Sequence, residues 1–316
     1  MRVHKSIIFL ASAVTVSFLA MLFENRLNPY YYQIAIYVGI NIILASSLNL
    51  INGFAGQFSL GHAGFMAVGA YTSAVITTEL QIAGNSILYA PIFALALLSG
   101  GVVAAIFGLI VGIPSLRLKG DYLAITTLGF GEIIRVIVQN LDFLGGARGF
   151  TGIPKISNFF WVFSITAVLI FLIRNLINST YGKAFLAVRD DEIAAEAVGI
   201  SSTRVKVIAF VTGAFFAGMA GALYANFVTY INPAQFSFLK SFEIVVMVII
   251  GGMGSILGVI LSAILLTILP EALRSVAQYR MVIYSLLLIV IMITRPRGLF
   301  VLPRFGKHKI LSKSGM

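Results

Sequence analysis

The sequence of 316 residues contains no cysteine, which excludes disulfide bonds and thiolate metal sites. Its three histidines, His4, His62 and His308, are too scattered to predict a metal site. Charged residues are also scarce: they make up 10% of the chain, whereas a soluble domain carries about 25%. A chain with so little charge is not expected to present an ordinary water-exposed surface.

Patterns for nucleotide binding and catalysis are missing as well. No G-x-x-x-x-G-K-[ST] pattern occurs, so no phosphate-binding loop is predicted. The stretch GGMGSILG at 251–258 contains a G-x-G, but no predicted strand precedes it, so we do not interpret it as a dinucleotide site. No Ser-His-Asp or paired-carboxylate pattern stands out. We therefore predict no catalytic residue, metal or cofactor on this chain, and energy for active work must come from another chain or an ion gradient.

Apolar residues, in contrast, make up 59% of the chain. No soluble core of this size could hide so much apolar surface, so the sequence predicts a membrane protein. The apolar runs exceed the segments of about ten alternating residues that β-barrels use, and they predict an all-α polytopic fold with about 8–10 transmembrane helices in one domain, 1–316. The runs lie at 6–23, 30–51, 62–80, 88–112, 122–139, 159–177, 207–230, 242–269 and 281–294.

The positions of Lys and Arg set the predicted orientation. The net charge of +11 is typical of basic cytoplasmic loops, so it does not indicate nucleic-acid binding. The run at 6–23 is long for a signal peptide and lacks a convincing cleavage site, so we interpret it as a retained span that starts inside. The loop at about 178–206, the tail at about 295–316, Arg117 and Lys119 then lie inside. The basic residues expected outside are Arg26, Arg148, Lys155 and Lys240.

Glycines interrupt two of the apolar runs. Nine simple spans would place the basic tail outside, and a re-entrant or broken helix pair within 242–269 restores the parity. Irregular backbone at membrane depth is tolerated only where protein buries it or where it lines a watery cavity. The broken segments, 53–64 and 251–258, lie one in each half of the chain. This placement is typical of a transporter with a two-fold internal repeat and a path at the repeat interface.

Small residues recur at every fourth position in two runs and predict close helix packing. The two stripes are Gly100, Ala104, Gly108 and Gly112, and Gly213, Ala217, Gly221 and Ala225.

Polar residues at membrane depth are costly unless paired or wet, so each is a candidate for function. Asn52 and Gln57 either line a path or satisfy backbone groups freed by the break. For His62 we favour a cap or a helix–helix hydrogen bond, and for the two threonines a bond back to their own helix. Glu132 and Arg135, three residues apart, are predicted as a structural ion pair. The candidates for a translocation path are Asn52, Gln57, Ser59, His62, Thr126, Thr127, Gly252 and Gly254.

The loop YGKAFLAVRDDEIAAEAVGISSTRVK at 181–206 predicts a docking helix. Asp190, Asp191 and Glu192 are expected to open it, because acidic side chains stabilise a helix N-terminus. Gly199 is expected to end it. A position flat on the membrane is disfavoured, because the anionic leaflet repels acids. We therefore expect this helix to dock in a groove on another protein. Its apolar face would consist of Ala187, Ile193, Ala194, Ala197 and Val198.

At this loop the sequence resembles a known family. The run AAEAVG at 194–199 is similar to the EAA loop of ATP-binding-cassette (ABC) import permeases, although Ile193 stands where that pattern has its first Glu. Longer stretches resemble the branched-chain amino acid ABC permeases, and LRLKGDYLA resembles their M-type subunit. These stretches are GFAGQFSLGHAGFMAVGAYTSA at 53–74, LRLKGDYLAITTLGFGEIIR at 116–135, GGARGFTGIP at 145–154 and YGKAFLAVRDDEIAAEAVGI at 181–200.

The resemblance implies one permease subunit of an importer for leucine, isoleucine, valine or related neutral amino acids. It implies a second homologous permease subunit, an external solute-binding protein, and ATPase subunits that hold ATP and Mg²⁺. It also implies the bacterial cytoplasmic (inner) membrane, with both termini inside. The residues implied to couple to the ATPase are Arg189, Asp190, Asp191, Glu192, Ala194, Ala195, Glu196 and Gly199.

Two alternatives stay open. Urea and short-amide permeases share much of this pattern. An ion-coupled secondary transporter acting alone would need an intramembrane acid, for which Glu132 is the strong candidate. Asp121, at the start of the same run, is predicted as a helix N-cap. A path for branched-chain amino acids is expected to be mainly apolar, with no charged pair in the spans placed to clamp both ammonium and carboxylate.

Overall fold

The computed structural model describes residues 15, 28–80, 89–116, 118, 120–276, 279–294 and 298–299. Within these residues the chain is helical, apart from loops and one isolated β-bridge between Phe150 and Ile231. The helices are α2 (Pro29–Asn49), η2 (Leu50–Phe54), α3 (His62–Glu79), α4 (Tyr89–Ser115), α5 (Asp121–Gln139), η3 (Asp142–Leu144), η4 (Gly146–Arg148), α6 (Phe159–Asn178), α7 (Thr180–Asp190), α8 (Glu192–Ala197), α9 (Ser202–Val228), η5 (Pro233–Phe236), α10 (Phe238–Gly251), α11 (Ile256–Ala272), η6 (Leu273–Val276) and α12 (Arg280–Thr294).

Several predictions fall on residues that the structure does not describe. These are the span at 6–23 apart from Thr15, the tail at 295–316 apart from residues 298 and 299, and Arg26, Arg117, Lys119, His4 and His308.

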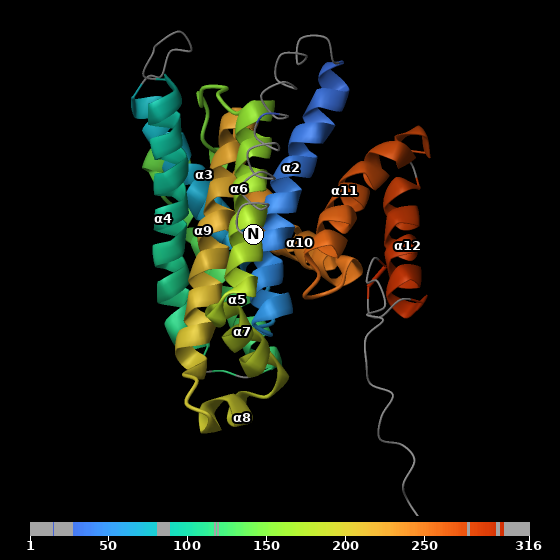
Figure 1. Ribbon diagram of the computed structural model, residues 1–316. Coiled ribbons are helices and arrows are strands. Elements are labelled where there is room, and N and C mark those ends of the chain that lie inside the picture. Colours follow the sequence, from blue (N-terminus) through green and yellow to red (C-terminus); the bar gives the residue numbers. More distant parts are fainter. Residues whose placement is uncertain are drawn as a thin grey trace, which may run out of the picture.

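Long apolar helices dominate the described part of the chain. Figure 1 shows α2, α4, α6 and α9 standing in one bundle, with α11 and α12 beside it. The protein is therefore an all-α polytopic membrane protein, as predicted. The five helices that are long and apolar enough to cross a bilayer are Pro29–Phe54, Tyr89–Ser115, Phe159–Asn178, Ser202–Val228 and Pro233–Gly251.

Small residues let α3, α4 and α9 approach closely, as the two stripes predict. A Cβ on Gly69 of α3 would overlap the backbone of Gly218 in α9. A Cβ on Gly218 would in turn overlap the side chain of Ala104 in α4. Because no side chain separates these backbones, van der Waals contact holds the three helices together without an aqueous hydrophobic effect.

The first break is shorter than predicted. The helix expected to end near residue 51 continues as η2 to Phe54, and only residues 55–61 are non-helical before α3. The π-type turn explains the extension, because Ala55 N donates to Leu50 O, five residues earlier, over 3.1 Å. Gly53, assigned to the break from the sequence, is therefore helical.

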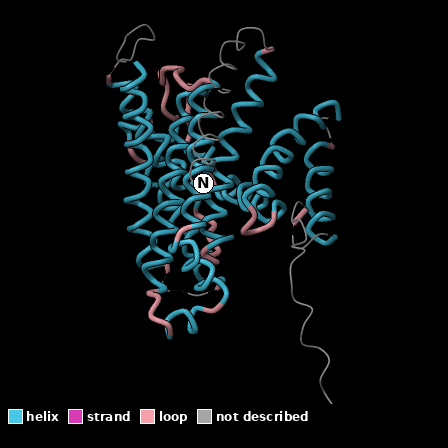
Figure 2. Tube along the Cα trace, viewed as in Figure 1, coloured by secondary structure: helices cyan, strands magenta, loops and turns pink. Residues whose placement is uncertain are grey.

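The second break is present where the glycines predicted it. Helix α10 itself has 14 residues and so a length of about 21 Å, and it reaches the length of a span only together with η5, as Pro233–Gly251. The chain turns at 252–255 and returns as α11, which packs against α10. Figure 2 shows this turn as a loop between two helices, away from the loops at the ends of the bundle.

The chain leaves α9, before this hairpin, and leaves α11 on the same side of the molecule. At the end of α11, Glu271 accepts a 2.7 Å hydrogen bond from the hydroxyl of Tyr30, at the start of α2. The ring of Tyr32 lies 6.1 Å from that of Phe227, near the end of α9 and just before the chain enters the hairpin. Helices α7 and α8 lie at the other end of the bundle (Figure 1). The pair α10–α11 therefore enters and leaves on the side opposite to α7 and α8.

Two charged residues differ from their predicted positions. The N-cap of α5 is Gly120, with φ +59°, and Asp121 is the first helical residue, where its carboxylate still faces the positive end of the helix dipole. Lys240 was expected in an external loop, but it is the third residue of α10.

Candidate functional site

The end of the helix α2–η2, just before the first break, contacts the second break. Asn49 Oδ1, at the end of α2, accepts a 2.8 Å hydrogen bond from Gly254 N, and Asn49 Nδ2 donates to Ser255 O over 3.3 Å. A Cβ on Gly53 would overlap the backbone of Gly254. Gly252 and Gly254 have φ of +90° and +83°, a conformation that side chains disfavour. The glycines of both segments thus allow two backbones to meet.

The predicted path residues of the first break make local hydrogen bonds. Asn52 Oδ1 accepts from Ser59 N over 3.1 Å, and Asn52 Nδ2 donates to Ser59 O over 3.4 Å. Gln57 Nε2 donates to Ala55 O over 3.2 Å. Asn52, Gln57 and Ser59 are all buried, and the side-chain amides of Asn52 and Gln57 hold the loop 55–61 in shape. Their contact with a passing substrate stays a prediction.

His62 and the threonines tie this break to its neighbours. His62 Nε2 lies 2.8 Å from Ser47 Oγ of α2, and the imidazole is fully buried. Thr127 Oγ1 accepts from Leu60 N over 3.0 Å and donates to a carbonyl of its own helix. Thr126, next to it, is half-buried. His62 therefore joins this segment to α2, and Thr127 joins it to α5.

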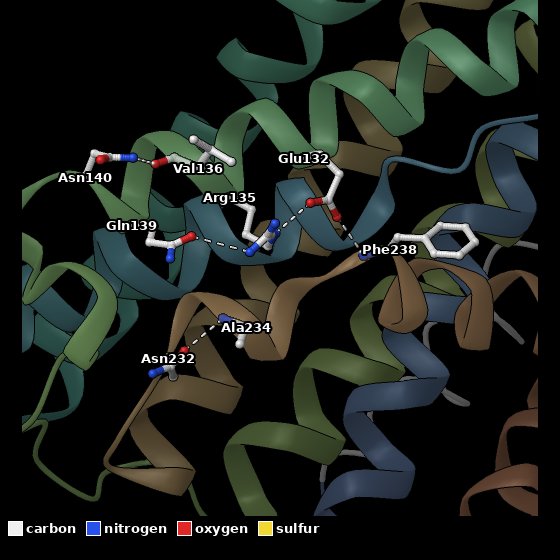
Figure 3. A network of polar contacts seen from close by, with 8 residues as sticks. All are labelled: Glu132, Arg135, Val136, Gln139, Asn140, Asn232, Ala234 and Phe238. Carbon is white, nitrogen blue, oxygen red and sulfur yellow. Dashed lines mark hydrogen bonds and ion pairs between the residues drawn. The ribbon is translucent and has the colours of Figure 1, made fainter.

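The pair Glu132–Arg135 holds the start of α10 (Figure 3). Arg135 Nε donates to Glu132 Oε2 over 2.6 Å, and Arg135 also lies 3.5 Å from Gln139. The other carboxylate oxygen of Glu132 accepts from Phe238 N, the first residue of α10, over 2.9 Å. A carboxylate is favourable at a helix N-terminus, so the pair joins α5 to the hairpin. The spacing predicted the pair but not Phe238, which lies 106 residues away.

The acidic cluster of the loop at 178–206 lies at the junction of two helices, α7 and α8. Asp190 ends α7, and Asp191 is the N-cap of α8, accepting 3.0 Å hydrogen bonds from Ile193 N and Ala194 N. The separation arises because Asp191 adopts an extended conformation that satisfies the first donors of the next helix. Gly199 follows the end of α8 with φ +86°, in the manner predicted for a helix stop.

A small core joins these helices to the end of α2. Phe185 of α7 and Ala195 of α8 are buried in one cluster with Leu50 and Phe54 of η2 and with Val205 of α9. Glu192 strengthens the junction, because it pairs with the buried Lys206 of α9 over 2.7 Å. Glu196 accepts a hydrogen bond from Ser202. A displacement of α8 would therefore be transmitted to η2 and to the start of α9.

Arg189, near the end of α7, lies close to both breaks. Its Nη1 donates to Gly53 O over 3.1 Å, and its Nε and Nη2 donate to Asp190 Oδ1 over 3.0 and 2.9 Å. A Cβ on Gly56 would contact its aliphatic stem, and a Cβ on Gly254 would lie 3.3 Å from Nη1. The guanidinium thus contacts the first break and adjoins the second.

The outer face of α8 is apolar and exposed. Ile193 and Val198 are 76% and 77% exposed, and Ala194 and Ala197 are also exposed, whereas Ala195 faces the core. Exposed aliphatic side chains of this kind, outside the bundle and beside charged residues, are typical of a surface that receives another protein.

The sequence analysis missed a polar cavity of about 300 Å³ between α2, α9, α10 and α11. In it, Lys240 Nζ lies 3.0 Å from Glu243 Oε2 and 3.4 Å from Asn41 Oδ1, and Asn41 Nδ2 donates to Thr267 Oγ1 over 2.9 Å. Both members of this charged pair lie on α10, where the sequence analysis did not consider a pair. The cavity is lined by Tyr37, Ile40, Asn41, Met66, Tyr224, Lys240, Glu243, Leu266, Thr267, Pro270 and Glu271.

This cavity continues toward the side where α2 begins. Tyr37 and Glu271 also line a second polar cavity, together with Tyr30 and Arg274. From Tyr30 to Asn41 the helix rises about 16 Å, so the two cavities, which share Tyr37 and Glu271, form a polar track of about this length along α2. The i, i+3 spacing of Lys240 and Glu243 was visible in the sequence, but Lys240 was assigned to a loop and Glu243 to the apolar run at 242–269, so the pair was not considered.

Comparison with known proteins gives consistent matches. The family model described as branched-chain amino acid transport system / permease component matches residues 30–294. The high-affinity branched-chain amino acid transport system permease proteins LivM of Salmonella typhimurium and of Escherichia coli K12 are each 37% identical over 307 residues, covering 86% of this chain and 70% of theirs. The permease protein LivH of Salmonella typhimurium is 24% identical over 288 residues, covering 84% of this chain and 92% of its own.

No solved structure matches the chain. Because the family match and the LivM identities extend over most of the sequence, the protein belongs to the family of branched-chain amino acid transport system permease components.

Proposed function

We propose that the chain is the transmembrane permease subunit of an ABC importer for leucine, isoleucine, valine or related neutral amino acids. The observation that carries the proposal is the 37% identity to two proteins named as branched-chain amino acid permeases. The polar track supports it, because a charged pair beside apolar walls suits a zwitterion with an aliphatic side chain. The chain itself performs no catalysis in this scheme and holds no cofactor.

The remaining parts of the importer are partner chains. ATPase subunits, which hold ATP and Mg²⁺, dock on the exposed face of α8 and on the residues around Arg189. A second homologous permease subunit completes the central path, and an external solute-binding protein delivers the amino acid to the side where α2 begins. The chain resides in the cytoplasmic membrane of a bacterium, with both termini inside.

The coupling proposal follows from the packing between α8 and the two breaks. Closure of the ATPase subunits moves α8, and the small core around Phe185 carries this motion to η2 and α9. Arg189 carries it to Gly53 and the turn beside Gly254. The hairpin α10–α11 bears Lys240 and Glu243, so the same motion changes the polar track.

Purification and reconstitution test this function. The tagged full chain, purified in mild detergent from its own cells, is expected to bring ATPase subunits with it. In proteoliposomes, the complex is expected to take up labelled leucine only with ATP and the binding protein. Uptake by the chain alone under an ion gradient would establish the secondary-transporter alternative. Uptake of urea or acetamide but not leucine would establish the amide alternative.

A further inference from the structure

We propose that Lys240 and Glu243, supported by Asn41, form a transit site that binds the two charged ends of the passing amino acid. Lys240 receives the α-carboxylate, and Glu243 receives the α-ammonium. This inference rests on the proposed function and names the residues that handle the substrate within it.

The geometry places both charges on one wall of the cavity. Lys240 and Glu243 lie one turn apart on α10, and their charged groups are 3.0 Å apart. Asn41 contributes an amide oxygen to Lys240 from across the cavity on α2, and Thr267 of α11 holds that amide in place. Opposite charges separated by one short contact match the spacing of ammonium and carboxylate in an α-amino acid.

The position of the pair distinguishes it from an ordinary surface ion pair. Charged side chains at membrane depth face the protein interior or a water-filled cavity, and they mark substrate pathways. Lys240 and Glu243 side chains are 23% and 37% exposed, and both line the cavity. The pair Glu132–Arg135 has similar exposure, but Glu132 holds the backbone of Phe238, a structural task.

The rest of the cavity suits an aliphatic side chain. Ile40, Met66 and Leu266 form an apolar wall beside the charged pair. Ligand cavities usually measure about 300–1,000 Å³, so a volume of about 300 Å³ suits a small molecule. The expected ligand class is therefore a neutral aliphatic amino acid, in which each charge finds a partner and the side chain meets apolar atoms.

The pair also explains how the site binds the amino acid and then releases it. In the empty cavity Lys240 and Glu243 neutralise each other, so neither charge is left unpaired. A zwitterion that enters exchanges each of these contacts for one of its own. When the hairpin moves, the two side chains pair again and displace the substrate.

Uptake of labelled leucine by the complete importer, in cells that express equal amounts of inserted permease, tests the proposal. The variants are Lys240→Gln, Glu243→Gln and the double variant. Lys155→Gln and Glu79→Gln are matched controls, because these exposed residues lie outside the cavity. Each cavity variant is expected to lower the maximal uptake rate about tenfold or more, on the scale of one lost hydrogen bond to a charged group. The controls are expected to retain the wild-type rate.

The double variant separates a transit site from a structural pair. If the pair only stabilises the fold, each single variant leaves an unpaired charge, and removal of both restores uptake. If the pair binds substrate, the double variant is as impaired as the single variants while ATP hydrolysis by the complex persists. Restored uptake in the double variant, or unimpaired single variants, would overturn the inference. A wild-type complex without ATP-dependent uptake would instead overturn the proposed function.

Discussion

Single glycines fix how closely the helices of this protein approach. Gly69 meets the backbone of Gly218, where even one methyl group has no room. Overpacking a core typically costs about 1–3 kcal/mol of unfolding free energy. We expect Gly69→Val to lower the free energy of unfolding by an amount at the upper end of this range, because neither backbone can move away. The matched control is Gly129→Ala in α5, where a Cβ would meet nothing within 4 Å and helix propensity improves by up to about 1 kcal/mol.

Thermal unfolding of the purified permease in detergent, followed by size-exclusion chromatography, measures both variants. Gly129→Ala is expected to keep or raise the midpoint, and Gly69→Val to lower it or to prevent purification. A Gly69→Val protein as stable as wild type would show that α3 and α9 are not in direct backbone contact.

Residues close in sequence were predictable, and those joined across the fold were not. The spacing of Glu132 and Arg135 indicates a helical pair without any knowledge of the fold. Asn49 contacts Gly254, which is 205 residues away, and no local pattern indicates such a partner. Lys240 was misassigned because its flanking residues, Phe238 and Leu239, gave no polar helix face to recognise. Long-range packing decides these positions.

At the scale of elements, the coupling helices and the two breaks form one mechanical unit. Arg189→Ala removes the hydrogen bond to Gly53 O, so α8 would move without moving the breaks. Leucine uptake by the importer is expected to fall about tenfold, equivalent to about 1.4 kcal/mol, while ATP hydrolysis by the complex continues. Arg189→Lys is expected to restore little of the uptake, because a lysine lacks the planar fork that reaches both Gly53 and Asp190.

The matched control for this variant is Arg174→Ala. It removes a positive charge from an exposed position near the C-terminal end of α6, just before α7 begins. It is expected to leave both uptake and ATP hydrolysis unchanged. Should Arg189→Ala transport leucine at the wild-type rate, the contact with Gly53 would have no part in coupling. A proportional loss of uptake and hydrolysis would indicate failed ATPase docking instead.

Element boundaries follow from the sequence only where local chemistry sets them. Glycines in the middle of the apolar run, together with charge parity, predicted the interruption that the structure has between α10 and α11. They placed the first break too early, since the π-type turn at Leu50–Phe54 continues a helix through Gly53. The acidic cluster predicted one docking helix, whereas Asp191 caps a second. In both cases the boundary depends on which group accepts the hydrogen bonds of a few backbone N–H groups, and composition does not show this.

At the scale of the whole molecule, the polar track and the coupling surface lie toward opposite ends. Tyr30 and Arg274 mark the end of the track, and Ile193 and Val198 mark the coupling surface. Between them stand the two breaks, joined by Asn49 and Gly254. Under the proposed function, a force that an ATPase subunit applies at α8 would reach the track through these contacts.

The absence of cysteine makes this arrangement directly testable, because each introduced cysteine is the only thiol in the chain. Lys155→Cys and Arg274→Cys are expected to react with a membrane-impermeant maleimide added to intact spheroplasts. Val198→Cys is expected to react only after permeabilisation, because α8 lies at the opposite end of the bundle. All three positions are exposed, so access to solvent on each side is not limited by packing. The labelling of residue 274 tests the hairpin. If α10 and α11 were one continuous crossing, the cysteine at 274 would be labelled only after permeabilisation, like the cysteine at 198 and unlike the one at 155.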